Sequence, residues 1–348
     1  MKILAATALF VLLVAAPARS QTSKPSSLAG LASYAGSDRE RLLVEGAKRE
    51  GKVVWYTTLA AHQNKQIASA FEVRYPGVKV DTYRTGSGEL IQRVLTEAKA
   101  RRHFVDAIET TLPGLVTFRD SQLFMPYTSL HLAGYPEDSK EKGPKNLVYW
   151  TIDRESFIGF AYNKNLLGAA DVPKNFDDLL RPALRDKMAM SGDETGARMI
   201  GAMLKVKGDG FVNKLKEQRI KAHMMAGSAL TQLVASGEVI ASPSQFYSAT
   251  HVAIENGAPL AWVPMDLVVA NEGGAAVYAH AQRPHAALLF VDFLLSAEGQ
   301  KLFEDLYFGS PRKEYGFKRW SPEKGLTIAQ YEEASEKWRE LLMGVTRK

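Results

Sequence analysis

Hydrophobic and polar positions follow two alternating patterns from residue 52 to residue 111. "KVVWYTT" is a run of β-branched and aromatic residues, and both "VKVDTY" and "FVDAIETT" also have the composition of strands. Between these segments, apolar residues recur at helical spacing, as Ile67 and Phe71 do before Pro76, and as Leu90 and Val94 do further on. Strand, helix, strand, helix, strand predicts a parallel sheet covered by helices, so the fold class is α/β.

A second series of the same kind follows in the middle of the chain. We expect a strand in "KMAMSG", a helix in "TGARMIGAMLKV", a strand in "GEVIASP" and a helix over 244–257 that ends at Gly257. The later segment "HAALLFVDFLLSAEGQKLFEDLYF" predicts two helices too apolar to be a free tail. The expected organisation is lobe 1 from 37–150 with 263–310, lobe 2 from 151–262, and a C-terminal segment 311–348 that packs back on the lobes.

The first residues have the pattern of a secretory signal. Lys2 precedes the apolar run "ILAATALFVLLVAA", and Ala18 and Ser20 supply small residues before a cleavage point. The alternative, a membrane anchor, is less favoured because the run is shorter than the ~20 apolar residues of a typical span. We therefore expect a signal peptide over 1–20, cleaved near Ser20, then a flexible linker over 21–36 that is rich in Ser, Ala, Gly and Pro.

Cysteine content and charge narrow the class of protein. The chain of 348 residues has no cysteine, which excludes thiol catalysis, Cys-ligated zinc, iron–sulfur clusters and lipid attachment through a cysteine. We expect a periplasmic location. Without Lys2 and Arg19 of the signal, 42 Lys and Arg stand against 38 Asp and Glu, a net charge of +4 with the signs interspersed. This pattern predicts a solvated mixed surface and no binding of nucleic acid.

Small hydroxyl residues recur where the predicted strands end. In parallel α/β sheets ligands bind beyond the carboxyl ends of the strands, next to helix N-termini. The residues that this rule selects as ligand-binding candidates are Thr57, Thr58, Ser87, Gly88, Thr111, Thr195, Arg198 and Tyr247. Each hydroxyl alone is equally well explained as a helix cap or turn residue, and Arg198 as a surface partner of Asp193 or Glu194. The recurrence at strand after strand favours a shared site.

Motifs of catalysis, nucleotide binding and metal binding are missing from the sequence. "TGSGEL" lacks the GK[ST] of a Walker loop and the third glycine of GxGxxG, and it is not a GxSxG elbow. The histidines show no HExxH or other metal-ligand spacing. We therefore expect no cofactor, no metal, no catalytic residue and no enzymatic activity.

Several segments resemble a known family. "VVWYTTLAAHQNKQIASAFEVRYPGVKVDTYRTGSGELIQRVLTEA", "FIGFAYNKNL", "NFDDLLRPALRDKMAMS", "LVASGEVIASP" and "AALLFVDFLLSAEGQKLF" are similar to the extracellular solute-binding proteins of ABC importers, in the branch that includes ferric-iron binders. The resemblance covers nearly all of the chain after the signal. It implies a two-lobed periplasmic binding protein clamp, a small-molecule ligand in the interlobe cleft, and an inner-membrane ABC permease as partner. We expect a monomer.

The chain departs from the iron binders where their metal ligands lie. That branch has adjacent tyrosines on the second lobe, whereas this chain reads "SQFYSA", with Phe246 beside Tyr247. A histidine is usual shortly after the first strand, but Ala60 stands there and His62 is displaced. Relatives without the tyrosine pair are similar to binders of small organic or phosphorylated anions, so we expect a small anionic solute, with Tyr247 closing over it. Two alternatives stay open: a ferric-iron carrier that uses Tyr247 with an exogenous anion, and a periplasmic serine hydrolase with Ser87 as nucleophile.

Overall fold

The computed structural model describes residues 27–225 and 227–347. The predicted signal peptide and residues 21–26 of the predicted linker lie outside the described residues. The linker prediction is wrong further on, because α1 (Leu28–Ser33) is a helix whose N–H of Gly30 donates to the Ser27 hydroxyl. Its Leu31 and Ala32 are buried, and burial of this apolar pair explains why the segment is ordered despite its linker-like composition.

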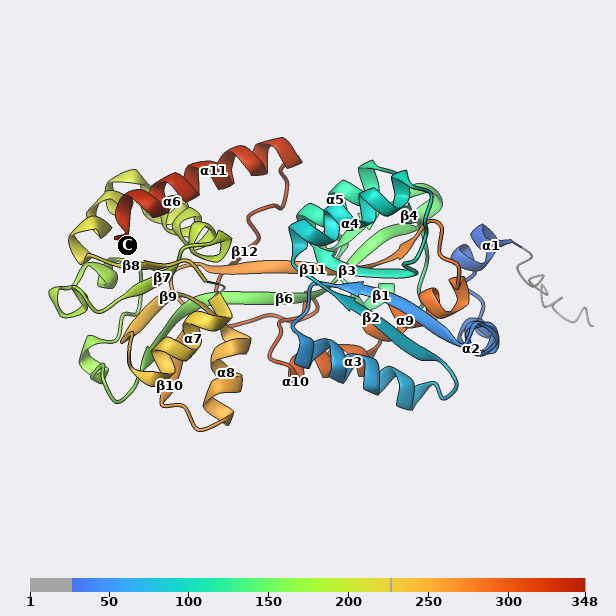
Figure 1. The fold of residues 1–348 in the computed structure, drawn as a ribbon, viewed down its shortest axis with the longest axis horizontal. Helices are drawn as coiled ribbons and strands as arrows, with labels where there is room; N and C mark the ends of the chain where they lie inside the picture. Colours follow the sequence, from blue (N-terminus) through green and yellow to red (C-terminus); the bar gives the residue numbers. More distant parts are fainter. Residues whose placement is uncertain (1–26, 226, 348) are drawn as a thin grey trace, which may run out of the picture.

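Lobe 1, on the right in Figure 1, contains the parallel sheet that the sequence predicts. Strand β1 (Lys52–Thr57) pairs in parallel with β2 (Lys79–Arg84) on one side and with β3 (Ala107–Thr111) on the other. The helices of this lobe are α2 (Arg39–Glu50), α3 (Ala61–Arg74), α4 (Ser87–Lys99), α5 (Leu112–Asp120), α9 (Pro284–Leu295) and α10 (Ala297–Asp305). The expected alternation of strands and helices is confirmed here.

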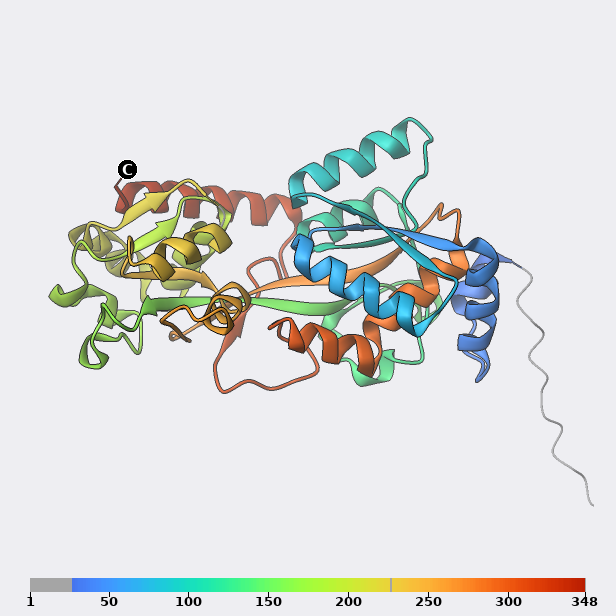
Figure 2. The ribbon, with the colours of Figure 1, turned by 60° about the horizontal axis from the view of Figure 1, so that its bottom comes forward.

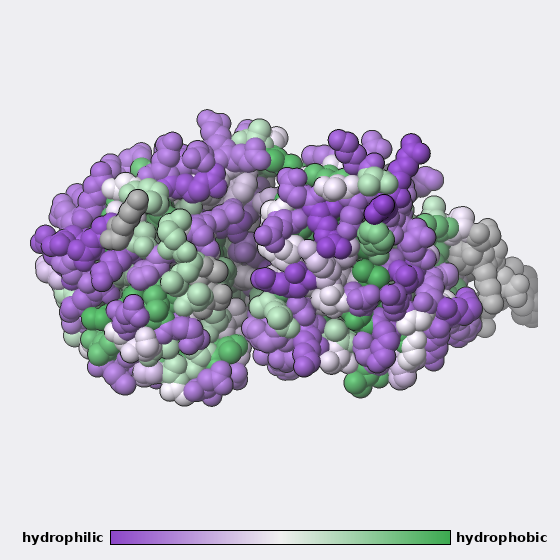
Figure 3. Space-filling view, in the orientation of Figure 1, coloured by the Kyte–Doolittle hydropathy of each residue, from purple (hydrophilic) through white to green (hydrophobic). Residues whose placement is uncertain are grey.

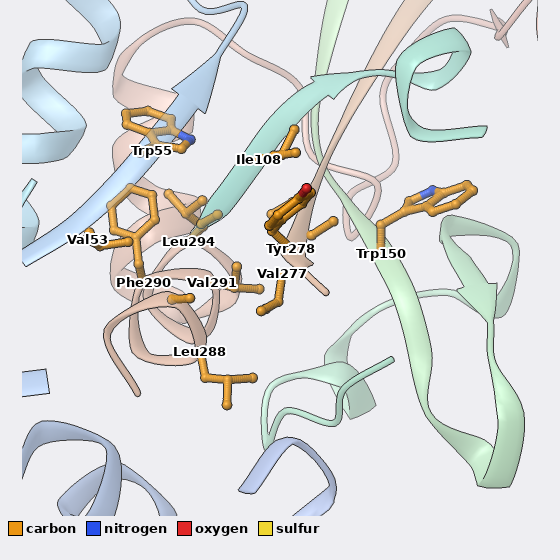
Figure 4. Close-up of a cluster of buried hydrophobic side chains, with 14 of the residues drawn as sticks. Val53, Trp55, Ile108, Trp150, Val277, Tyr278, Leu288, Phe290, Val291 and Leu294 are labelled. Carbon is orange, nitrogen blue, oxygen red and sulfur yellow. The ribbon is translucent and has the colours of Figure 1, made fainter. Parts of the chain in front are cut away.

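The core of lobe 1 joins two distant parts of the chain. Its buried cluster draws on residues 31–152 and 275–308. Figure 4 shows side chains of β1 and β3 meeting those of α9, including Trp55 and Phe290, whose ring centroids are 5.0 Å apart. α9 is buried on nearly all of its faces, which accounts for the continuous apolar run of its sequence.

Two long strands connect the lobes. β6 (Val148–Asn163) and β11 (Val268–Tyr278) pair antiparallel and run from one lobe into the other, as Figures 1 and 2 show. The sheet order is β10-β6-β11-β3-β1-β2, so β6 and β11 lie beside the parallel strands of lobe 1. Their polar residues, which include Arg154 and Ser156 on β6 and Asn271 on β11, therefore lie at the junction of the lobes.

Lobe 2 is built on β9 (Ala241–Phe246) and β10 (Leu260–Val263), which pair with β6, and on the parallel pair β7 (Ala189–Ser191) and β8 (Lys221–His223). Its helices are α6 (Glu194–Lys214), α7 (Gly227–Ser236) and α8 (Tyr247–Glu255). The helix predicted over 244–257 begins later than expected, because β9 continues to Phe246 through its pairing with β6. The lobe boundaries given above stay a prediction, although the two-lobed α/β fold itself is shown.

The remaining elements are short, apart from the last helix. They are β4 (Phe124–Met125), β5 (Lys140–Lys142), β12 (Arg319–Trp320), and the 3₁₀ turns Leu132–Gly134, Glu137–Ser139, Pro144–Asn146, Ala169–Asp171, Asp177–Leu180, Pro182–Leu184 and Leu215–Gln218. Helix α11 (Ile328–Val345) packs along α6 of lobe 2 and also contacts α5 of lobe 1. Among the residues that the structure describes, no helix is long and apolar enough to cross a membrane.

Candidate functional site

A large cleft lies between the two lobes. Its volume is about 2160 Å³, and it is lined by residues of both lobes and of the connecting strands. Figure 3 shows the molecule hollowed along this junction. Sites for small molecules usually measure roughly 300–1000 Å³. The cleft is therefore larger than one small solute would fill.

Helices α3, α4 and α5 of lobe 1 begin at the cleft. Gly86 is the N-cap residue of α4 and Thr111 that of α5, and neither helix receives a side-chain hydrogen bond at its N-cap. The hydroxyl oxygens of Ser87 and Thr111 lie 2.9 Å apart and face the cleft together. Helix N-termini carry partial positive charge and N–H groups without intrahelical partners. This wall of the cleft therefore favours an anion.

Arg154 forms part of the cleft floor, and sequence reasoning missed it. Its side chain is buried, and Nε donates to Glu109 Oε1 over 2.9 Å. Its terminal nitrogens lie 3.0 Å from Ser156 Oγ and 3.4 Å from Thr58 Oγ1. Glu109 is the ion-pair partner of Arg154, while the bonds to neutral hydroxyls leave N–H groups that can turn to a ligand oxygen. The signal that the sequence offered was the charged stretch "IDRES" inside a strand-like apolar segment.

The lobe 2 wall differs from that of lobe 1. At the N-terminus of α6, the Asp193 carboxylate accepts the N–H of Thr195 over 2.8 Å. This helix end is therefore already occupied by a negative charge of the protein itself. At the start of α8, Phe246 is the N-cap residue, and Ser248 and Ala249 line the cleft.

Arg198 lines the cleft but is bonded within the protein. Its side chain lies 2.5 Å from Glu323 and 3.1 Å from Glu194, and it donates to the Tyr331 hydroxyl over 3.1 Å. Burial alone would lower the pKa of Arg198, but Glu323, Tyr331 and Glu194 raise it. For Glu323, burial has the opposite effect and raises the pKa of the carboxyl group. The alternative weighed from the sequence, an arginine paired with Glu194, describes this geometry better than a free ligand contact.

The structure brings most of the sequence-predicted site residues to one cleft. Those that line it are Thr58, Ser87, Gly88, Thr111, Thr195 and Arg198. Whether they bind a ligand stays a prediction. Thr57 does not line it, because its side chain is fully buried and donates to Glu109 Oε2 over 2.6 Å.

Tyr247 does not line the cleft either, and its expected closing over the ligand stays a prediction. Its ring centroid lies 5.1 Å from that of Trp262 and 3.9 Å from that of His251. Phe246 lines the cleft instead, because it continues β9 and pairs with Ile158, another lining residue.

The glycines of the "TGSGEL" turn need no special backbone. Gly86 has the ordinary angles φ −69° and ψ 159°. A Cβ at Gly86 or Gly88 would meet no protein atom within 4 Å. Both residues line the cleft, so the space that they leave belongs to it.

Comparison with known proteins places the chain in a family. The sequence profile described as "Bacterial extracellular solute-binding protein" matches residues 61–301. A protein of Haemophilus influenzae described as uncharacterized is 26% identical over 276 residues, which are 75% of this chain and 78% of that one.

Solved structures share the fold. Iron-bound HitA from Pseudomonas aeruginosa has a TM-score of 0.65 at 23% identity, over 84% of this chain and 99% of that one. AfuA from Actinobacillus pleuropneumoniae, solved with exogenous fructose-6-phosphate, has a TM-score of 0.62 at 21% identity, over 85% and 97% of the two chains. With the family profile matched over more than half of its length, this chain belongs to the bacterial extracellular solute-binding proteins.

Proposed function

We propose that this chain, as the periplasmic solute-binding component of an ABC importer, captures a small organic or phosphorylated anion in the interlobe cleft. It acts as a monomer and delivers the solute to an inner-membrane permease. The transport role follows from the family, whereas the anionic nature of the solute is inferred from the cleft.

The observation that carries the proposal is the lobe 1 wall. The N-termini of α4 and α5 have no side-chain cap, and the hydroxyls of Ser87 and Thr111 lie beside them. Arg154 supports the same end of the cleft from the floor. Backbone N–H groups, hydroxyls and a guanidinium are the donors that oxyanions accept in proteins.

Lobe closure completes the proposed cycle. The cleft is larger than a small solute needs, so a solute held by lobe 1 gains contacts when lobe 2 approaches. Closure also excludes water, which strengthens each hydrogen bond to the anion. The solute thereby shifts the population toward the closed form that the permease recognises.

An iron cargo is less compatible with the cleft. HitA and other neighbours are described as iron-bound or ferric-binding, so the alternative needs an answer from the residues. Phe246, which lines the cleft, has no oxygen to offer, and Tyr247 lies outside the lining. Tyr331 does line the cleft, but its hydroxyl is bonded to Glu194 and Arg198 and burial raises its pKa. Tight binding of ferric iron relies on hard oxygen ligands such as phenolate, so we do not favour this cargo.

The hydrolase alternative also lacks support at Ser87. The Ser87 hydroxyl is bonded to Thr111, and within residues 27–225 and 227–347 no histidine is bonded to it. A serine nucleophile needs an adjacent general base. We assign the cleft binding and no chemical step.

Thermal unfolding with a panel of solutes tests the proposal. A ligand that binds the native state raises the unfolding midpoint by mass action. We expect a rise with phosphate esters or small carboxylates, and none with putrescine or with ferric iron supplied as a chelate and compared with the chelator alone. A rise with iron or putrescine and with no anion would overturn the proposal.

A further inference from the structure

The cleft floor changes in polarity from lobe 1 to lobe 2. Along β6, the lining residues Arg154, Ser156 and Ile158 are two residues apart, as expected for side chains on one face of a strand. Asn271 of β11 is opposite Ser156, and Phe246 of β9 is opposite Ile158. From Arg154 toward lobe 2 the floor is therefore cationic, then hydroxyl- and amide-bearing, and then apolar. Ile152 and Trp150 of β6 line it on the lobe 1 side of Arg154.

The two ends are far enough apart to hold different parts of one molecule. A strand rises about 3.3 Å per residue, so Arg154 and Ile158 are separated by roughly 13 Å. A bare oxyanion or a single metal ion spans only a small part of that length. A solute whose anionic group lies near Arg154 can contact Phe246 only if the rest of the solute extends toward lobe 2.

The lobe 2 end carries further apolar residues beside the polar Gln232, Ser248 and Asn256. Ala249 and Val252 of α8 also line the cleft near the end of β9, on the helix that Phe246 caps. Phe246 itself is only partly buried, so its ring is available to the cleft. An apolar surface opposite uncapped helix N-termini is suited to a solute with one charged and one apolar end.

We propose that the solute is an organic phosphate or carboxylate with a ring, whose anionic group lies at the lobe 1 wall and whose ring packs on Phe246 and Ile158. This inference rests on the proposed function and adds the chemical class of the solute. Phe246 is its specificity-determining residue, since it supplies an apolar aromatic face where a tyrosine would supply a metal ligand.

Matched pairs of probes test the inference. Phenyl phosphate and methyl phosphate share one headgroup, as benzoate and acetate do, and differ in the ring. Burying one face of the ring removes apolar surface from water. For a headgroup that the protein binds, we therefore expect the ring-bearing probe to bind at least about tenfold more tightly than its ring-free partner, as measured by calorimetric titration. In Phe246→Ala the two affinities become similar, whereas Phe246→Leu retains part of the difference.

The control is Phe104→Ala, which removes an exposed phenylalanine outside the cleft lining and leaves the affinity ratio unchanged. Thermal unfolding shows that each variant is folded. Equal binding of the ring-bearing and ring-free probes to the wild type overturns the inference that the solute has a ring and leaves the anion proposal intact. A ratio that persists in Phe246→Ala also overturns the inference. If none of the four probes binds, both proposals fail.

Discussion

The two walls of the cleft have the same local design, a strand followed by a helix that begins at the cleft. The N-terminus of α6 in lobe 2 is bonded to an acidic side chain, whereas α4 and α5 of lobe 1, and α8 of lobe 2, have no side-chain hydrogen bond at the N-cap. In lobe 1, α4 and α5 begin at Gly86 and Thr111 without a side-chain cap. In lobe 2, Asp193 already accepts an N–H at the start of α6. The comparison teaches that a hydroxyl at a strand end is insufficient to predict an anion-binding site. An acidic residue of the protein itself can occupy the helix N-terminus where the anion would bind.

Two buried arginines that line the cleft show a similar contrast. Arg154 is bonded to a single carboxylate, that of Glu109, and to neutral hydroxyls. Arg198 is bonded to the carboxylates of Glu194 and Glu323 and to a tyrosine. The first arginine can exchange a hydroxyl for a solute oxygen, while the second stabilises the attachment of the C-terminal segment.

The largest effect should come from Arg154→Ala. The substitution leaves the fully buried Glu109 without its ion pair and removes the cationic end of the cleft. Breaking a buried ion pair costs about 3–5 kcal/mol of the free energy of unfolding. Urea unfolding measures this loss of stability. Calorimetric titration of the folded variant should detect no anion binding. Wild-type stability in this variant would contradict the role given to the Arg154–Glu109 ion pair.

Arg198→Ala should affect stability and leave solute affinity almost unchanged. Glu323, which is 8% exposed, loses its partner, so we expect the free energy of unfolding to fall by about 3 kcal/mol. The double variant Arg198→Ala/Glu323→Gln, measured in the same urea titration, should recover part of that loss. A large drop in solute affinity would instead show that lobe 2 holds the anion.

Ser87→Ala and Thr195→Val compare the walls directly. Ser87 lies beside uncapped N–H groups, so its loss should weaken solute binding by about 1–2 kcal/mol, the contribution of a hydrogen bond to a charged group. Thr195 lies where Asp193 is already bonded, so its substitution should change the affinity less. Calorimetric titration of both variants shows which substitution weakens solute binding more. Equal losses of affinity would contradict the distinction between the two walls.

The smallest expected effect is on the pH dependence of stability and concerns Glu155 on the connecting strand β6, away from both walls. Burial raises its pKa to about 7 from 4.5, against the opposing charge of Arg319. In that interval the native state holds a proton that the unfolded chain has lost, so this contribution to stability is present below pH 4.5 and is lost as pH rises through 7. Glu155→Gln should therefore show a weaker fall of the thermal midpoint over this range. An unchanged pH profile, with the exposed Glu298→Gln as control, would contradict the assignment.

Local patterns predicted the alternation of strands and helices, and most of the candidates chosen from them line the cleft, because strand ends and helix starts leave short-range signals. They did not separate Thr57 from Thr58. These adjacent residues differ because one points toward Glu109 inside lobe 1 and the other toward the cleft. The start of α8 was expected a few residues too early, and Phe246, the last residue of β9, lines the cleft while Tyr247, the first residue of α8, does not.

Contacts between distant residues gave no signal in the sequence. Glu323, the partner of Arg198, is 125 residues away in the chain. Arg154 lies on a strand that the sequence marked only as the border between lobes, and its partner Glu109 comes from another strand. Their roles depend on how the sheet brings β3, β6 and β11 together, which the local pattern of one segment does not determine.

The most direct test of the central claim is native mass spectrometry of the purified protein and two glycine variants. Gly86 and Gly168 have nearly the same backbone, with φ −69° and ψ 159° against φ −66° and ψ 150°, and open space where a Cβ would stand. Only Gly86 lines the cleft. We expect one small organic anion per chain in the wild type and in Gly168→Val, and none in Gly86→Val. Retention of the anion by Gly86→Val, or stoichiometric iron in the wild type, would contradict the account.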